Sequence, residues 1–147
     1  MWSVFNDSDL FLITVNSTLK TNGNLVMGRG IAKEAKDRFP ILPVIAGAYL
    51  EKAGLDQQFF GIARQLIPGN PIGLFQVKHH YRSDATLNLI KESSKMLANI
   101  LSSESDLSRV HLNAPGIGNG RLNTEPVFKL IGEILGDYSD RLTIWIK

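Results

Sequence analysis

Apolar residues in this chain fall into short runs separated by polar stretches that contain glycine. Short apolar runs bounded by Gly, Pro, Asn or Asp are typical of strands. The predicted strands are Trp2–Phe5, Leu10–Val15, Phe59–Ile67, Ile72–Lys78, Val110–Ala114 and Leu142–Ile146. The sequence PGNP joins the third and fourth of these runs, which predicts a hairpin-like pair.

Between the strands, apolar residues recur every three or four positions, as on one face of a helix. The predicted helices are Ile31–Phe39, Pro43–Ala53, a long helix from Ser83 or Asp84 to about Leu101, and Thr124–Leu135. Pro40 and Gly136 end two of them, and Thr124 is a capping residue followed by a favourable first turn.

The resulting order, ββααββαβαβ, places helices between strands throughout the chain. This alternation predicts an α/β fold, a three-layer sandwich in which helices cover both faces of a mixed sheet. No internal repeat and no Pro-, Gly- or Ser-rich linker divides the chain, so residues 1–147 are expected to form a single domain.

Composition excludes several classes of function. The 147 residues are 44% apolar and contain no cysteine, which removes disulfides, thiolate metal sites and a cysteine nucleophile. A formal charge of +2 does not by itself indicate nucleic-acid binding. Without an apolar run of membrane-spanning length or a leader pattern, we expect a soluble, unprocessed cytoplasmic protein with no membrane partner.

Two loops that contain glycine each follow a predicted strand and lead into a helix. They are GNLVMGRG, with Gly23, Gly28 and Gly30, and PGIGNG, with Gly116, Gly118 and Gly120. Glycine lets backbone N–H groups approach an anion, and a helix N-terminus adds free donors and partial positive charge. The pair predicts a diphosphate site, although neither loop has the pattern of a nucleotide-hydrolase loop or a dinucleotide fingerprint.

Three segments in order resemble macrodomains, the ADP-ribose-binding family, and in particular a phage and bacterial branch related to the terminal ADP-ribose protein glycohydrolases. The segments are ITVNSTLKTNGNLVMGRGIAKEAKDRFP, FQVKHHYRSDATLNLIKESS and NAPGIGNGRL. The resemblance runs from about Leu10 to Ile146. It implies ADP-ribose, or ADP-ribosylated protein or nucleic acid, as the partner, and it implies no cofactor.

The resemblance also implies binding roles. Asn16 matches the asparagine that approaches the distal ribose, and an acidic residue near the N-terminus, Asp7 or Asp9, would hold adenine. The first loop would line ribose and diphosphate with Met27, Gly28, Arg29, Gly30 and Ile31. The second would hold the diphosphate with Pro115, Gly116, Ile117, Gly118, Asn119 and Gly120.

Lys78 matches the lysine that attacks the anomeric carbon in the resembling glycohydrolases. A lysine at its ordinary pKa is protonated at neutral pH, so burial or a neighbouring cation has to lower that pKa. Asn123 stands where the branch carries an acidic residue, and an amide performs no acid–base chemistry. Glu125, two residues further along, could take the place of that acidic residue, or its negative charge could only stabilise the N-terminus of the helix.

Three functions therefore stay open. The chain is a lysine-dependent ADP-ribosyl hydrolase, a non-catalytic reader of ADP-ribose, or an interaction domain without a nucleotide ligand. No metal is expected, because the adjacent His79 and His80 would point to opposite sides of an extended chain.

Overall fold

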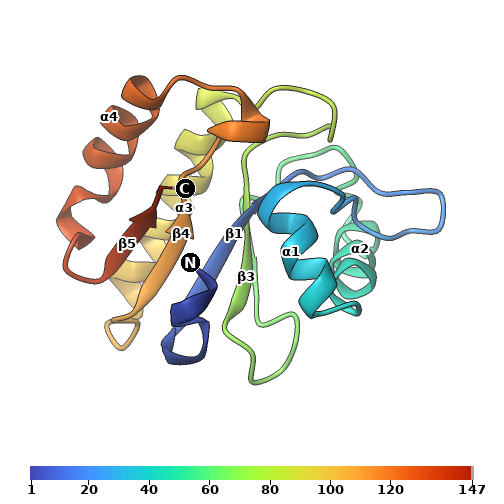
Figure 1. Cartoon of the computed structure of the whole chain (residues 1–147), viewed down its shortest axis with the longest axis horizontal. Coiled ribbons are helices and arrows are strands. Elements are labelled where there is room, and N and C mark those ends of the chain that lie inside the picture. The colour runs from blue at the N-terminus through green and yellow to red at the C-terminus, as the bar shows by residue number, and fades with distance from the viewer. Residues whose placement is uncertain (147) are drawn as a thin grey trace.

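The structure, a computed structural model, describes residues 1–146 and is built around a five-stranded sheet (Figure 1). The strands are β1 (Leu10–Val15), β2 (Ile62–Arg64), β3 (Ile72–Gln76), β4 (Val110–Asn113) and β5 (Leu142–Trp145). Their order across the sheet is β2-β3-β1-β4-β5. Only β2 runs antiparallel to its neighbour, so the sheet is mixed. The carboxyl ends of β3, β1, β4 and β5 consequently meet at one edge.

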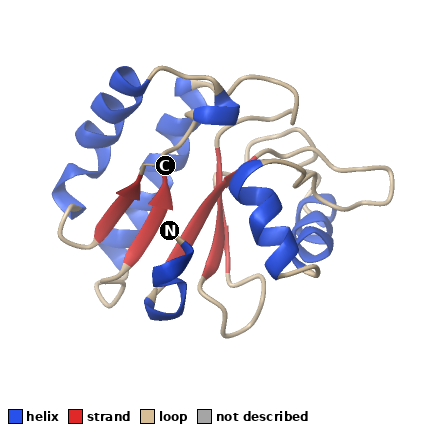
Figure 2. Ribbon diagram, viewed as in Figure 1, coloured by secondary structure: helices blue, strands red, loops and turns tan. Residues whose placement is uncertain are grey.

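Helices cover both faces of this sheet, which confirms the three-layer α/β sandwich (Figure 2). They are α1 (Gly30–Arg38), α2 (Leu42–Lys52), α3 (Leu87–Ser103) and α4 (Thr124–Leu135). Three short 3₁₀ helices are η1 (Trp2–Asp7), η2 (Gly118–Gly120) and η3 (Gly136–Tyr138).

The alternation within β1 creates two separate cores. Phe11 and Ile13 pack with residues of α1 and α2, whereas Leu10 and Leu12 pack with residues of α3 and α4. All four side chains are at most 3% exposed. A strand with both faces buried needs apolar residues at successive positions, which explains the unbroken run LFLI.

The predicted strand Trp2–Phe5 is wrong, because these residues lie in η1. In a 3₁₀ helix, side chains three residues apart lie on the same side. Trp2 and Phe5 are spaced in this way, and both rings pack against Phe11, with centroids 4.7 and 5.1 Å away. Aromatic packing on the sheet therefore favours a helical turn over an edge strand.

Several element boundaries also differ from the predictions: β3 ends at Gln76 and not at Lys78, and Asn123, not Thr124, is the N-cap residue of α4. The long helix begins after Thr86, whose Oγ1 accepts from Leu89 N at 3.1 Å, and neither Ser83 nor Asp84 caps it. The strand predicted over 59–67 shortens to β2, because the amides of Phe60 and Gly61 donate to a side chain, Gln76 Oε1.

Within residues 1–146, no helix is long and apolar enough to cross a membrane. The same residues contain no group of three or more His, Asp or Glu side chains placed to hold a metal ion.

Candidate functional site

Three segments meet at the carboxyl edge of the parallel strands: the first loop (residues 16–29), the lysine segment (77–86) and the second loop (114–123). Ala85 N donates to Gly120 O at 2.9 Å, which joins the lysine segment to the second loop. A Cβ built on Gly30 would lie 2.6 Å from Asn119 Nδ2, so the second loop also touches the start of α1. Residues far apart in the sequence therefore form one continuous surface.

Asn16 holds the first loop in shape. Its Nδ2 donates to Val26 O at 3.0 Å, and its Oδ1 accepts from Thr18 N at 2.9 Å. Thr18 Oγ1 in turn donates to His79 O at 2.9 Å, which ties this loop to the lysine segment. The Asn16 side chain is 7% exposed. In the structure it is therefore a buried residue that stabilises the conformation of the first loop.

The first loop ends at an N-terminus of α1 that no side chain caps. The first amides of a helix have no partner within it, so they are available to an anion. Gly28, Arg29 and Gly30 are exposed around these amides, whereas the Met27 side chain is 1% exposed and belongs to the core. Ile31 is partly buried against the same core.

Glycines of the second loop fall into two groups. A Cβ on Gly116 would lie 2.6 Å from Ile90 Cδ1, and one on Gly120 would lie 2.8 Å from Ala85 Cβ. Gly118, by contrast, faces open space with φ of 77°. The packed glycines bring the loop close to α3, and this approach leaves Gly118 and Asn119 exposed at the surface. Pro115 is buried and Ile117 is partly buried beneath them.

Lys78 lies where the three segments meet, and its side chain is half-buried. Burial lowers the pKa of its ammonium group, nearby Asp84 raises it, and the positive charges of Arg121 and Arg29 lower it further. Arg29 belongs to the first loop and Arg121 to the second. The amine is therefore less strongly protonated than an exposed lysine, as a nucleophile requires.

Gln76, which sequence reasoning missed, supports this lysine. Its fully buried amide donates to Lys78 O at 3.3 Å and to Ser17 Oγ at 3.1 Å, and its carbonyl accepts the two amides that shorten β2. A fully satisfied buried polar network fixes the backbone around it. A glutamine ending an otherwise apolar strand was the available signal.

Asn123 and Glu125 lie at the N-terminus of α4, just after the second loop. Asn123 occupies the N-cap position, where its side chain makes no capping hydrogen bond, and Glu125 is in the first turn. Both side chains are exposed. Both are therefore accessible from solvent beside the second loop.

Asp9 is not brought to the loops. It precedes β1 and therefore lies at the opposite edge of the sheet, where its Oδ2 accepts from the amides of Ser108 and Arg109 at 3.0 and 2.9 Å. Asp7 is exposed in η1, two residues earlier in the chain. The strand direction separates both carboxylates from the two glycine loops.

Two open surface hollows, of about 420 and 450 Å³, are lined neither by Lys78 nor by the exposed glycines of the two loops. One is bordered by the first loop and the facing ends of α1 and α2, and the other lies between α3 and α4. We place the candidate site at the loops, because the uncapped helix, the exposed glycines and the half-buried lysine come together there.

Similarity to known proteins was found through structure. No family model matches the chain, and no curated protein matches it in sequence. The structure of Thermosipho africanus DarTG in complex with ADP-ribose superposes with a TM-score of 0.76 at 22% identity, covering 95% of this chain and 38% of that one. This chain thus spans less than half the length of the DarTG chain.

Two separate macrodomains are similar over most of their length. That of Thermus aquaticus DarG has a TM-score of 0.71 at 24% identity, and that of Mycobacterium tuberculosis DarG has 0.72 at 23%. Each comparison covers 95% of this chain and 88% of the other. Together with the mixed sheet between helices, these similarities show that the chain has the macrodomain fold.

Proposed function

We propose that this protein binds ADP-ribose, or an ADP-ribosyl group on a protein or nucleic acid, at the loop edge of the sheet. The diphosphate would lie between the amides at the start of α1 and the exposed backbone of Gly118 and Asn119. The distal ribose would face Lys78. The DarTG structure, part of which has the same fold, was determined with ADP-ribose bound, and this supports the choice of ligand.

We further propose that Lys78 cleaves the ADP-ribosyl bond. The observation that carries this step is a half-buried amine whose pKa is lowered by burial and by the positive charges of Arg121 and Arg29, one from each loop. The neutral Nζ attacks the anomeric carbon, forming a C–N bond while the bond to the leaving group breaks. The leaving group takes the electron pair of the broken bond and the proton that the new ammonium loses. Water then attacks the same carbon, the C–N bond breaks with its electron pair going to Nζ, and a proton from the water restores the amine as ADP-ribose is released.

Asn123 favours a second candidate, a reader that binds ADP-ribose without cleaving it. An amide neither accepts nor delivers the proton that the leaving group needs. In the hydrolase, this proton would pass through water or through Glu125, which is exposed in the first turn of α4. The reader and the hydrolase share one pocket and differ only in turnover.

Incubation with a glutamate-ADP-ribosylated peptide and with an ADP-ribosylated DNA strand distinguishes the two, with released ADP-ribose as the readout. If Lys78→Ala abolishes the release of ADP-ribose and the exposed control Lys91→Ala does not, the hydrolase is supported. Binding without release supports the reader. Calorimetry that detects no binding of ADP-ribose overturns both. Thermal unfolding gives a second test, because ligand at a hundred times its dissociation constant should stabilise the fold by about 2.7 kcal/mol.

A further inference from the structure

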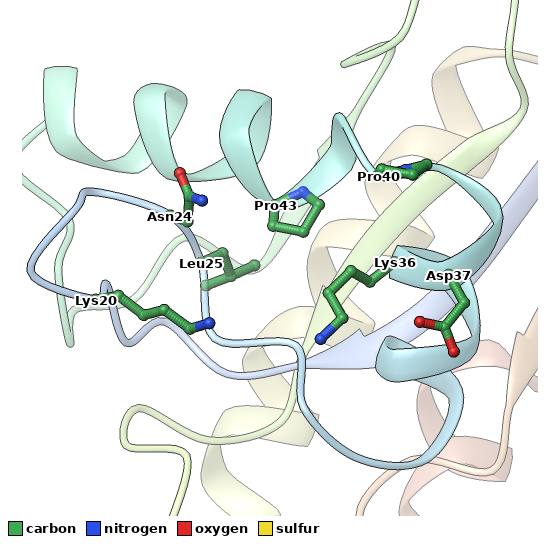
Figure 3. A pocket seen from close by; sticks show the side chains of 7 residues that line it. All are labelled: Lys20, Asn24, Leu25, Lys36, Asp37, Pro40 and Pro43. Atoms are coloured by element: carbon green, nitrogen blue, oxygen red, sulfur yellow. The ribbon is translucent and has the colours of Figure 1, made fainter.

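The hollow beside α2 has a mixed polar and apolar lining, to which the first loop contributes Lys20, Asn24 and Leu25 and to which neither Lys78 nor the second loop contributes (Figure 3). Its volume is about 420 Å³. Leu25 and Pro43 form a buried apolar floor, and Leu25 N donates to Pro43 O at 3.0 Å. The remaining lining residues are Lys20, Asn24, Lys36, Asp37 and Pro40.

Two positive charges converge on this hollow. Figure 3 shows Lys20 and Lys36 directed toward one another across the space next to Leu25. Neither ammonium group takes part in an ion pair within residues 1–146, and Asp37 is bonded to Lys33 at 2.7 Å. Like charges that face each other repel, and a carboxylate or phosphate between them would turn this repulsion into attraction.

An apolar helix face continues from the hollow. Pro40 and Pro43 line the hollow, and their sequence neighbours Ile41 and Val44 are 51% and 44% exposed. Ala48, four residues after Val44, is exposed as well. Ile41 is the N-cap residue of α2, and positions 41, 44 and 48 follow one face of the helix, where a solvated helix would carry polar side chains.

We propose that this hollow and the adjoining α2 face dock an acidic segment of a partner protein. One carboxylate of the segment would sit between Lys20 and Lys36, and a neighbouring aliphatic or aromatic side chain would pack on Ile41 and Val44. None of its lining residues is one that the ADP-ribose proposal uses, so this proposal goes beyond the ADP-ribose function and does not depend on it.

Charge and polarity select this occupant over two others. A nucleic-acid strand binds along a polar, basic track, and here the surface beside the lysines is apolar. A second copy of this chain would bring Lys20 and Lys36 against the same lysines or against Lys52, which follows on the same face of α2. An acidic segment with apolar neighbours satisfies both parts of the surface.

A library of twelve-residue peptides displayed on phage, selected against the whole protein, tests the proposal. Enriched peptides should carry Asp or Glu next to Leu, Ile or Phe. Their affinity, measured by fluorescence polarisation, should fall at least tenfold in the double variant Lys20→Glu/Lys36→Glu and in Val44→Asp. It should stay unchanged in Lys91→Glu/Lys129→Glu, which alters the hollow between α3 and α4.

Several results would overturn the proposal. They are no enrichment, enriched peptides without acidic residues, or binding that the lysine double variant leaves intact. A single-stranded DNA oligonucleotide that binds here, or a dimer that Val44→Asp dissociates, would identify a different occupant. If Val44→Asp unfolds, the lysine double variant decides, since one of its positions is exposed and the other is half-buried.

Discussion

The first and second loops are both rich in glycine, yet their glycines have different surroundings. The first loop is held by side-chain hydrogen bonds from Asn16 and Thr18, and a Cβ on Gly28 would meet nothing within 4 Å. The second loop is held by packing, with Gly116 and Gly120 pressed against side chains of the core.

This difference decides what a glycine substitution measures. At Gly116 an added side chain tests folding, and at Gly28 it tests the ligand. Gly118 mixes the two effects, because it faces open space but has φ of 77°, which strains any other residue whether or not a ligand is bound. Glycines in similar sequence patterns therefore have different roles, and substitutions at Gly116 and Gly28 separate these roles.

The largest expected effect is loss of stability in Gly116→Val. Left-handed backbone strain costs about 1–3 kcal/mol, and overpacking against Ile90 and Leu122 costs about as much again. Urea denaturation should show the sum. Gly54→Val is the matched control, because Gly54 has φ of 70° with nothing within 4 Å and should show the strain alone. Equal losses in the two variants would contradict the packing role.

The next effect is loss of ligand affinity in Gly28→Val. Its backbone has no left-handed strain and the space is open, so we expect the free energy of unfolding to stay within about 0.5 kcal/mol of wild type. The dissociation constant for ADP-ribose should rise about a hundredfold, equivalent to about 2.8 kcal/mol. Calorimetry measures it, with Gly132→Val on α4 as the control. Unchanged affinity would remove the diphosphate from the first loop.

Most of the fold was predictable, because buried positions repeat every two residues in strands and about every 3.6 in helices. β1, β4, α1, α2 and α4 confirm the prediction to within a residue or two. The rule that gathers the loops at the carboxyl edge also places Asp9 away from them, because a residue just before β1 must lie at the other edge. This separation followed from strand direction and could have been inferred from the sequence.

The surroundings of Lys78 could not be inferred in this way. Arg121 and Asp84 approach each other at 3.7 Å although 37 positions separate them in the sequence. The contact depends on the second loop packing against Ala85 through Gly120. No local pattern encodes such a pair, whereas the buried Gln76 left a visible signal within its strand.

A smaller effect is expected at the end of the second loop, in Asn123→Asp. The change returns an ionisable oxygen at almost constant volume, and the exposed, uncapped position tolerates it. Hydrolysis of the ADP-ribosylated peptide should rise about tenfold, below the ~10²–10⁴ of a well-placed acid–base group, because the carboxylate is solvated. The gain should vanish when Lys78→Ala is added, since both groups act on one bond. Unchanged turnover would make Glu125 the next residue to test.

The smallest expected effect is a shift of the pH–rate profile when the arginine of either loop is replaced, Arg29 in the first loop or Arg121 in the second. Burial, Arg121 and Arg29 lower the pKa of Lys78, and Asp84 raises it. Because the neutral amine is the nucleophile, the rate rises as pH passes that pKa. Arg121→Gln and Arg29→Gln remove a cation, so the rising limb should move to higher pH, and Arg121 should move it further.

Asp84→Asn should move the same limb to lower pH, because it removes the charge that favours the ammonium form. The measurement is kcat/KM against pH for each variant, and Arg109→Gln at the opposite edge of the sheet is the control. The midpoint is the deciding quantity, since Arg29 also borders the ligand loop and its loss weakens binding at every pH. If the midpoint stays fixed in all three variants, deprotonation of Lys78 does not control turnover, and the lysine is not the nucleophile.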